Sequence, residues 1–86
     1  MMERQTFEIA RVYVPVKRAK TLETAKVEAL AEDMLERGQT TPISVRTDKK
    51  DGADRYVLIE GLHRLEALKA LGETTVTGFL VQARIR

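Results

Sequence analysis

The feature that most constrains the fold is a stripe of apolar residues at helical spacing. Five of them recur at positions i, i+3, i+4, i+7 and i+8: Val27, Leu30, Ala31, Met34 and Leu35. This period is typical of an amphipathic helix with one apolar face. Thr24 precedes the stripe and has the side chain of an N-cap, and Gly38 follows it as a stop signal. The pattern therefore predicts one helix between Thr24 and Gly38.

Segments rich in β-branched and aromatic residues surround this helix. The expected strands are residues 7–14, 43–46, 55–59 and 75–81. The first has one irregular position in its alternation, and Pro15 closes it. A charged loop over residues 47–54 joins the second and third strands into a hairpin and is expected to be exposed.

A second helix is expected after the third strand. Leu65, Leu68 and Leu71 mark its apolar face, the chain turns sharply into it at Gly61, and Gly72 ends it. The order is then strand, helix, strand, strand, helix, strand, without a repeat or a low-complexity linker. This order predicts an α/β (α+β) fold in a single domain over residues 1–86.

Composition excludes several classes of protein. The 86 residues contain no cysteine, which excludes a disulfide framework, a thiolate metal site and a cysteine nucleophile. No apolar run approaches the ~20 residues that cross a bilayer, and the first residues do not resemble a signal peptide. The formal net charge is only +2, so nucleic-acid binding through charge alone is not indicated. We expect a cytoplasmic chain with no membrane partner.

The junction between the third strand and the second helix carries the candidate site. Gly61 permits an unusual turn, and the helix begins with backbone N–H groups that have no intrahelical partner. His63 and Arg64 add side chains that can be positively charged, which is unfavourable at a helix start unless an anion binds there. A phosphate would fit this arrangement. On spacing alone, a surface or structural histidine is an equally good interpretation.

Residues 58–67, which read LIEGLHRLEA, resemble the signature of the superfamily that unites ParB N-terminal domains and sulfiredoxins. Other segments fall into the same pattern, including a Val-Pro-Val segment that enters a basic loop and the approach to the second strand over residues 39–45. The resemblance covers roughly residues 9–83. It implies a small ParB/sulfiredoxin-like fold with a mixed sheet and two main helices.

The likeness to sulfiredoxins implies a phosphate-binding role for part of this motif. Their motif is Gly-Cys-His-Arg, in which the cysteine attacks a phosphorylated sulfinic acid and the His-Arg pair holds ATP phosphates. Leu62 stands at the cysteine position, so sulfinic-acid reduction by that route is not available to this chain. Gly61, His63 and Arg64 carry over as phosphate-binding candidates.

Two cations outside the motif also match positions beside the nucleotide in relatives. Lys26 matches a nucleotide-contacting lysine of sulfiredoxins, and Arg18 lies in a basic loop over residues 17–20 where relatives place a basic residue. A guanidinium there would stabilise phosphate charge. The nucleotide-binding set implied by the resemblance is Gly61, Leu62, His63, Arg64, Lys26 and Arg18.

ParB partition proteins and free-serine kinases carry variants of the same motif. In ParB it is Gly-Glu-Arg-Arg, part of a CTP site, and Leu62 replaces the glutamate here. The helix-turn-helix and dimerisation regions of a partition protein are not among these 86 residues, so both a free-standing module and a part of a longer protein stay open as interpretations. Free-serine kinases share Gly-x-His-Arg and use a carboxylate after the first strand, a region in which Glu23 is the first acid of this chain.

We therefore expect a module that binds the phosphates of ATP or CTP, with Mg²⁺ as an accompanying ion, in a regulatory or DNA-associated role with DNA or a protein as further partner. The alternative is nucleotide-dependent phosphoryl transfer or hydrolysis, as in an ATPase or a small-molecule kinase, with Glu23, Asp33 or Glu60 positioning metal or nucleophile. A third interpretation is a vestigial site on a protein-interaction scaffold.

Two simpler expectations accompany these hypotheses. Glu60 is expected to pair locally with Arg64 or Lys26 rather than to hold a metal, so no metal ligand and no catalytic residue is assigned. Most of the aromatic residues are expected in the core rather than at an interface: Phe7, Tyr13, Tyr56 and Phe79.

Overall fold

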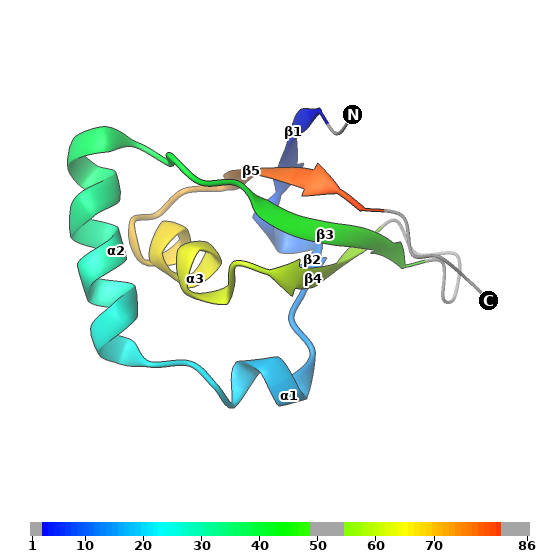
Figure 1. Ribbon diagram of the computed structural model, residues 1–86, viewed down its shortest axis with the longest axis horizontal. Helices are drawn as coiled ribbons and strands as arrows, with labels where there is room; N and C mark the ends of the chain where they lie inside the picture. The colour runs from blue at the N-terminus through cyan, green and yellow to red at the C-terminus, as the bar shows by residue number, and fades with distance from the viewer. Residues whose placement is uncertain (1–2, 49–54, 82–86) are drawn as a thin grey trace.

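A computed structural model describes residues 3–48 and 55–81, and Figure 1 shows the arrangement of its elements. In chain order they are β1 (Arg4–Glu8), the 3-10 helix η1 (Ile9–Arg11), β2 (Val12–Tyr13), α1 (Val16–Ala19), α2 (Thr24–Arg37), β3 (Ile43–Asp48), β4 (Arg55–Glu60), α3 (Leu62–Ala70) and β5 (Thr75–Leu80). Helix α3 lies between α2 and the sheet (Figure 1).

The strands form one mixed sheet in the order β1-β5-β3-β4-β2. The expected hairpin is confirmed by the antiparallel pairing of β3 with β4, and β5 pairs with β3 in parallel. The two N-terminal strands form the ends of this order, because β1 pairs antiparallel with β5 and β2 pairs parallel with β4. The mixed sheet and the two main helices, α2 and α3, confirm the expected fold class.

The prediction of a single first strand is wrong. The turn η1 divides the segment into β1 and β2, which lie at opposite ends of the strand order. A three-residue link reaches at most about 14 Å, whereas four strand spacings in a flat sheet amount to about 19 Å. The sheet must therefore curl until its two ends approach each other. Phe7 of β1 and Tyr56 of β4 accordingly meet edge to face, with ring centroids 4.8 Å apart.

The sheet and the helices enclose an apolar core centred on β3 and α3. Ile43, Val45 and Leu65 are fully buried. Ile43 lies against two glycines, since a Cβ atom at Gly61 or at Gly78 would approach within 3.0 Å of its side chain. The close approach of the β4–α3 junction and of β5 to this one side chain therefore depends on the absence of a side chain at both positions.

The expectation for the aromatic residues holds only in part. Phe7 is buried, and Tyr56 and Phe79 are half-buried. Tyr13, however, is 41% exposed. It lies on β2, which has only two residues and pairs on one side with β4. The guanidinium of Arg55 covers its ring at 4.7 Å from the centroid.

Helix α2 follows the predicted stripe with two differences. It begins at Thr24 with Glu23 in the N-cap position, so the assignment of Thr24 as N-cap is wrong by one residue. It ends at Gly38 as predicted, where φ is 72° and the N–H donates to the Met34 carbonyl at 2.7 Å. Leu35 is 75% exposed, because α2 is an outer helix that packs on α3 and covers it with a narrower stripe than predicted.

Three expected boundaries also change. The basic loop over residues 17–20 is largely helical, because α1 makes one turn there. The hairpin loop starts later than expected, since Thr47 and Asp48 extend β3; the loop residues 49–54 lie outside the described residues. Strand β5 ends at Leu80, one residue before the expected end.

Candidate functional site

The candidate site begins where β4 turns into α3. Gly61 occupies the N-cap position of α3 with φ 106°, a left-handed conformation that favours glycine. Its carbonyl accepts the first helical hydrogen bond, from the Leu65 N–H at 2.9 Å. A Cβ atom at Gly61 would lie 2.6 Å from Cγ2 of Ile43. Both the backbone conformation and the packing therefore require glycine, as the sharp turn predicted from the sequence implied.

The first turn of α3 leaves three backbone N–H groups without a partner in the described chain. They belong to Leu62, His63 and Arg64, which precede the first residue that can donate within the helix. No side chain caps the helix, and its first turn contains no acidic residue. The positive end of the helix dipole is thus uncompensated by a carboxylate of its own first turn.

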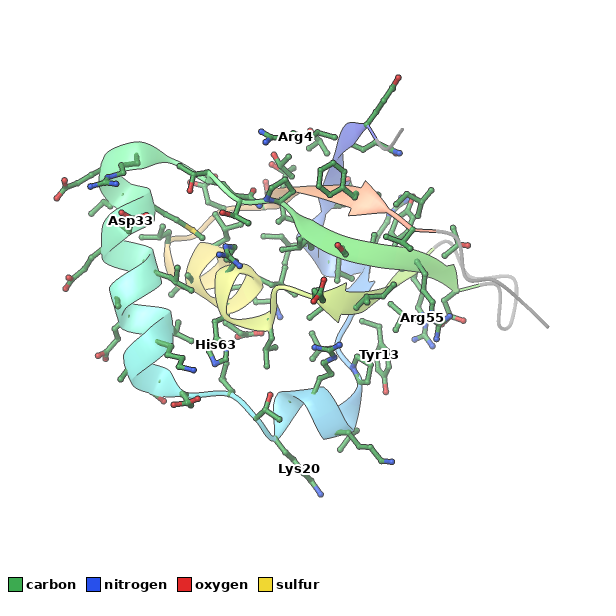
Figure 2. The ribbon with its side chains drawn as sticks, in the orientation of Figure 1. Arg4, Tyr13, Lys20, Asp33, Arg55 and His63 are labelled. Carbon is green, nitrogen blue, oxygen red and sulfur yellow. The ribbon has the colours of Figure 1, made fainter. Side chains whose placement is uncertain are left out.

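His63 joins the start of α3 to the start of α2. Its Nε2 atom accepts a hydrogen bond from the backbone N–H of Glu23 at 3.1 Å, and its side chain points toward the segment that precedes α2 (Figure 2). A ring nitrogen that accepts carries no proton, so this geometry places the proton of the neutral ring on Nδ1. The imidazole is therefore anchored through one nitrogen and retains one donor for a ligand.

The flanking cations differ in how they are held. Lys26 forms an ion pair with Glu23 at 3.1 Å, and both side chains are about 60% exposed. Arg64 is half-buried, and Arg18 is exposed on α1; neither makes an ion pair or a side-chain hydrogen bond within the described residues. The structure thus brings Lys26 and His63 together around Glu23, whereas no hydrogen bond or ion pair of the described residues joins Arg18 to them.

The acidic candidates are placed less favourably for metal binding. Asp33 pairs with Arg37 one turn later on α2, at 3.4 Å. Glu60 is exposed at the end of β4, and the expectation that it pairs with Arg64 or Lys26 is wrong, because Lys26 pairs with Glu23. Within residues 3–48 and 55–81, no group of three histidine or acidic side chains could hold a metal ion.

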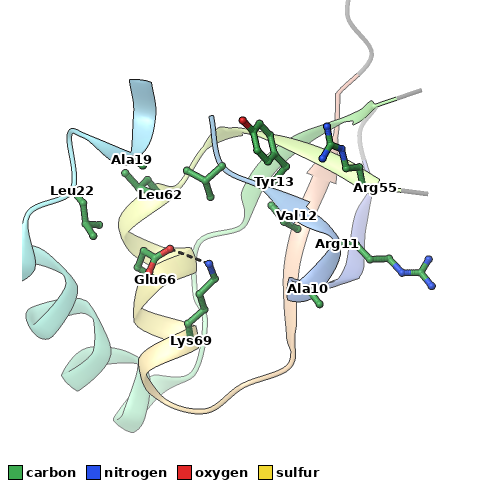
Figure 3. Close-up of a pocket in the computed structure, with 11 residues that line it drawn as sticks. Ala10, Arg11, Val12, Tyr13, Ala19, Leu22, Arg55, Leu62, Glu66 and Lys69 are labelled. Atoms are coloured by element: carbon green, nitrogen blue, oxygen red, sulfur yellow. Dashed lines mark hydrogen bonds and ion pairs between the residues drawn. The ribbon is translucent and has the colours of Figure 1, made fainter. Parts of the chain in front are cut away.

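The side chain of Leu62 lies on another side of the helix start. It is 6% exposed and helps to line a pocket of about 360 Å³, which we call the α1–α3 pocket (Figure 3). The other walls come from residues 10–14, Ala19 and Leu22, Arg55, and the α3 residues Glu66 and Lys69. Sequence patterns missed this pocket, because its walls come from segments far apart in the chain. Of the predicted nucleotide-binding residues, only Leu62 lines it.

Comparison with known proteins supports the expected resemblance. The profile of the ParB N-terminal domain matches residues 4–86. Sulfiredoxin from Arabidopsis thaliana has a similar crystal structure, with a TM-score of 0.79 and 25% sequence identity; the match covers 94% of this chain and 86% of that one. A C-terminally truncated ParB from Caulobacter crescentus, complexed with CTP-gamma-S, gives a TM-score of 0.77 and 24% identity. A variant of a free serine kinase in complex with AMP gives 0.75 and 22%.

The extent of these matches differs between relatives. The ParB match covers 98% of this chain but 46% of that one, and the kinase match covers 91% and 30%. The chain thus spans about half of that ParB and less than a third of the kinase. No curated protein matches the sequence. Among the helices of the described residues, none has the length and apolar character needed to span a bilayer.

Proposed function

The chain belongs to the ParB N-terminal domain family, and we propose that it is a nucleotide-binding module that holds phosphate groups at the start of α3. The observation that supports this most is the open helix start, where the first turn has three free backbone N–H groups and the Arg64 side chain but no acidic residue and no capping side chain. A phosphate would supply both the missing acceptors and the missing negative charge.

Each side chain of the site has a distinct part in this proposal. Arg64 makes no ion pair within the described residues, so its guanidinium is available for two parallel hydrogen bonds to phosphate oxygens. His63 donates from Nδ1 while Nε2 keeps its bond to Glu23. Lys26 contributes less, because the Glu23 carboxylate already compensates part of its charge. Arg18 adds charge from α1 without a fixed position.

The identity of the nucleotide is the first question for experiment. The ParB relative holds CTP-gamma-S and the kinase relative holds AMP, which makes CTP and ATP the two candidate ligands. Titration calorimetry with ATP, CTP, ADP and GTP, each with Mg²⁺, compares them directly. We expect micromolar binding of ATP or CTP by the parent chain.

A matched pair of arginine variants tests the location of the site. Arg64→Ala is expected to lower nucleotide affinity by about 1.5–3 kcal/mol, since it removes charge-assisted hydrogen bonds. Arg37→Ala is the control, because Arg37 lies in the last turn of α2 and pairs with Asp33. Equal affinities of the parent and Arg64→Ala chains would refute the proposed site. If no nucleotide binds to the folded parent chain, the site is vestigial and the scaffold alternative takes its place.

For the alternative function, phosphoryl transfer or hydrolysis, one of the three candidate acids has the most favourable position. Glu23 and Asp33 are each engaged in an ion pair, whereas Glu60 is exposed beside the helix start and has no ion pair within the described residues. If the module turns over its nucleotide, Glu60 is the residue placed to orient a metal ion or a water. Phosphate release measured for the parent chain and for Glu60→Gln decides this, and release that is unchanged in the variant would exclude the role.

The proposal also includes an association of the module with DNA. With a net charge of +2, the chain itself offers little electrostatic affinity for a duplex. We therefore expect any binding to duplex DNA to be weak and strongly salt-dependent, and to change when the nucleotide is bound. Fluorescence anisotropy with a labelled duplex, with and without the nucleotide, tests this. Identical binding curves in the two conditions would show that DNA binding does not depend on the nucleotide site.

A further inference from the structure

Exposed apolar side chains gather around the α1–α3 pocket. The described residues contain four large hydrophobic side chains that are exposed, and three of them lie between residues 13 and 22: Tyr13, Val16 and Leu22. Tyr13 and Leu22 line the pocket, and Val16 precedes the lining residue Ala19 by three positions on α1, which places both on one face of that turn. Exposed apolar groups concentrated at one site indicate a contact surface.

The pocket has an apolar floor and a charged rim. Val12 and Leu62 are 7% and 6% exposed and form the floor, and Glu66 and Lys69 stand on the α3 wall (Figure 3). A volume of about 360 Å³ is near the lower limit for a small-molecule site. It is sufficient for one large apolar side chain, the kind of anchor that dominates protein–peptide contacts.

The charges around the pocket favour an acidic partner. Among the described residues, Glu66 is the only carboxylate that lines it, and Lys69 already pairs with it at 3.1 Å. On the adjoining helix turn, Lys17, Arg18 and Lys20 are exposed and make no ion pair within the described residues. The apolar surface is thus bordered by cations whose charge the described part of the chain leaves uncompensated.

We propose that the α1–α3 pocket docks an acidic segment of a partner protein. A large apolar side chain of that segment enters the pocket over Val12 and Leu62, and its flanking carboxylates contact the cations of α1. This surface shares Arg18 with the proposed phosphate contacts but otherwise differs from them, because it uses the side chain of Leu62 and not the donors of His63 and Arg64. The proposal does not depend on nucleotide binding.

Selection from a phage-displayed library of short random peptides tests the proposal on the intact chain. We expect the enriched peptides to share one Leu, Phe, Ile or Met flanked by Asp or Glu. Absence of enrichment, or enrichment of basic or wholly polar peptides, would overturn the proposal. The best peptide is then synthesised, and its affinity is measured by fluorescence anisotropy.

Two exposed leucines provide a matched pair of variants. Leu22 is 41% exposed and lines the pocket, whereas Leu35 is 75% exposed on α2 and does not. Leu22→Ser is expected to weaken peptide binding by about tenfold, and Leu35→Ser should leave it unchanged. Equal affinities of both variants and the parent would place the peptide elsewhere. Ala19→Glu is a second test, because Ala19 is exposed and tolerates substitution, and its added carboxylate should repel the acidic peptide.

The charge requirement has a test of its own. The double variant Lys17→Glu and Lys20→Glu should weaken the peptide several-fold at low salt, and the difference should shrink at high salt. Arg64→Ala should bind the peptide as the parent does, even if it loses the nucleotide, so the two proposals can fail independently. A dimer of the free chain that Leu22→Ser dissociates and Leu35→Ser does not would assign the pocket to a second copy and overturn the acidic-partner proposal.

Discussion

The starts of α2 and α3 meet through one hydrogen bond but differ in the charge beside them. At α2, the N-cap residue Glu23 has its backbone N–H satisfied by His63 and its carboxylate beside the first turn, paired with Lys26. At α3, the N-cap residue is Gly61, and the first turn presents free N–H groups beside the cation Arg64. Carboxylates stabilise helix starts and cations destabilise them. Neither helix has a side-chain cap or an acidic residue in its first turn, so the two starts differ in the N-cap residue, which brings a carboxylate at α2 and no side chain at α3.

The largest effect is expected at the glycine that makes the α3 start possible. Gly61→Ala combines the strain of a positive φ, about 1–2 kcal/mol, with overpacking against Ile43, about 1–3 kcal/mol. Gly72→Ala is the matched control, because Gly72 also has a positive φ but nothing within 4 Å of its Cβ position. Urea unfolding should show a clearly larger loss for Gly61→Ala, and equal losses would contradict the packing argument.

The next effect comes from giving α3 the kind of start that α2 has. Arg64→Glu places a carboxylate in the first turn and should stabilise the free chain by about 0.3–1 kcal/mol while it lowers nucleotide affinity by about 2–3 kcal/mol. Thermal unfolding without ligand and titration calorimetry with ligand measure the two changes. If Arg64→Glu instead lowers the stability of the free chain, the cation at the start of α3 does not destabilise the helix.

Removing the bond between the two starts should have a smaller effect. His63→Ala leaves the Glu23 N–H to water, at a cost of about 0.5–1 kcal/mol because that group is exposed. Hydrogen exchange at the Glu23 amide, followed by NMR, should become faster. His63→Gln keeps an acceptor at this place and should restore part of the protection. Unchanged exchange in both variants would mean that the bond contributes nothing to the start of α2.

The smallest effect concerns Lys26. Lys26→Ala should lower nucleotide affinity only about twofold to threefold, since the side chain is mostly exposed and already paired. Lys69→Ala breaks an ion pair of the same spacing and length on α3, with Glu66 at 3.1 Å, and should not change nucleotide affinity. Calorimetry on both variants distinguishes the loss of a phosphate contact from the loss of a surface ion pair. If Lys26→Ala binds the nucleotide as tightly as Lys69→Ala does, Lys26 is not part of the site.

Features set by neighbouring residues were predictable from the sequence, and those set by distant contacts were not. The helical period of α2, the hairpin and the turn at Gly61 follow from local patterns, and each is present. The division of the first strand depends on which distant strands its halves pair with. The exposure of Leu35 likewise depends on α2 packing mainly on α3.

The candidate site shows the same limit. The residues of the α3 start were recognisable because glycine, histidine and arginine follow a strand in consecutive positions. The partner of His63 was not, because Glu23 lies forty positions earlier in the chain and contributes a backbone N–H, which leaves no mark in the sequence. The α1–α3 pocket escaped prediction because the apolar residues Val16 and Leu22 lie within a basic segment, where no period reveals a shared surface.

The division of the N-terminal segment also determines when this chain can fold during synthesis. Arg4 pairs with Phe79, whereas Val12 pairs with Tyr56, so β2 meets its partner strand earlier in synthesis than β1 does. Until β5 is made, β1 has no strand to join, whereas β2 can already pair with β4 of the hairpin. Such long-range pairing slows folding, because a large loop must close before its contacts form. We therefore expect the pairing of β1 with β5 to be the last step in the assembly of the sheet, after translation of β5.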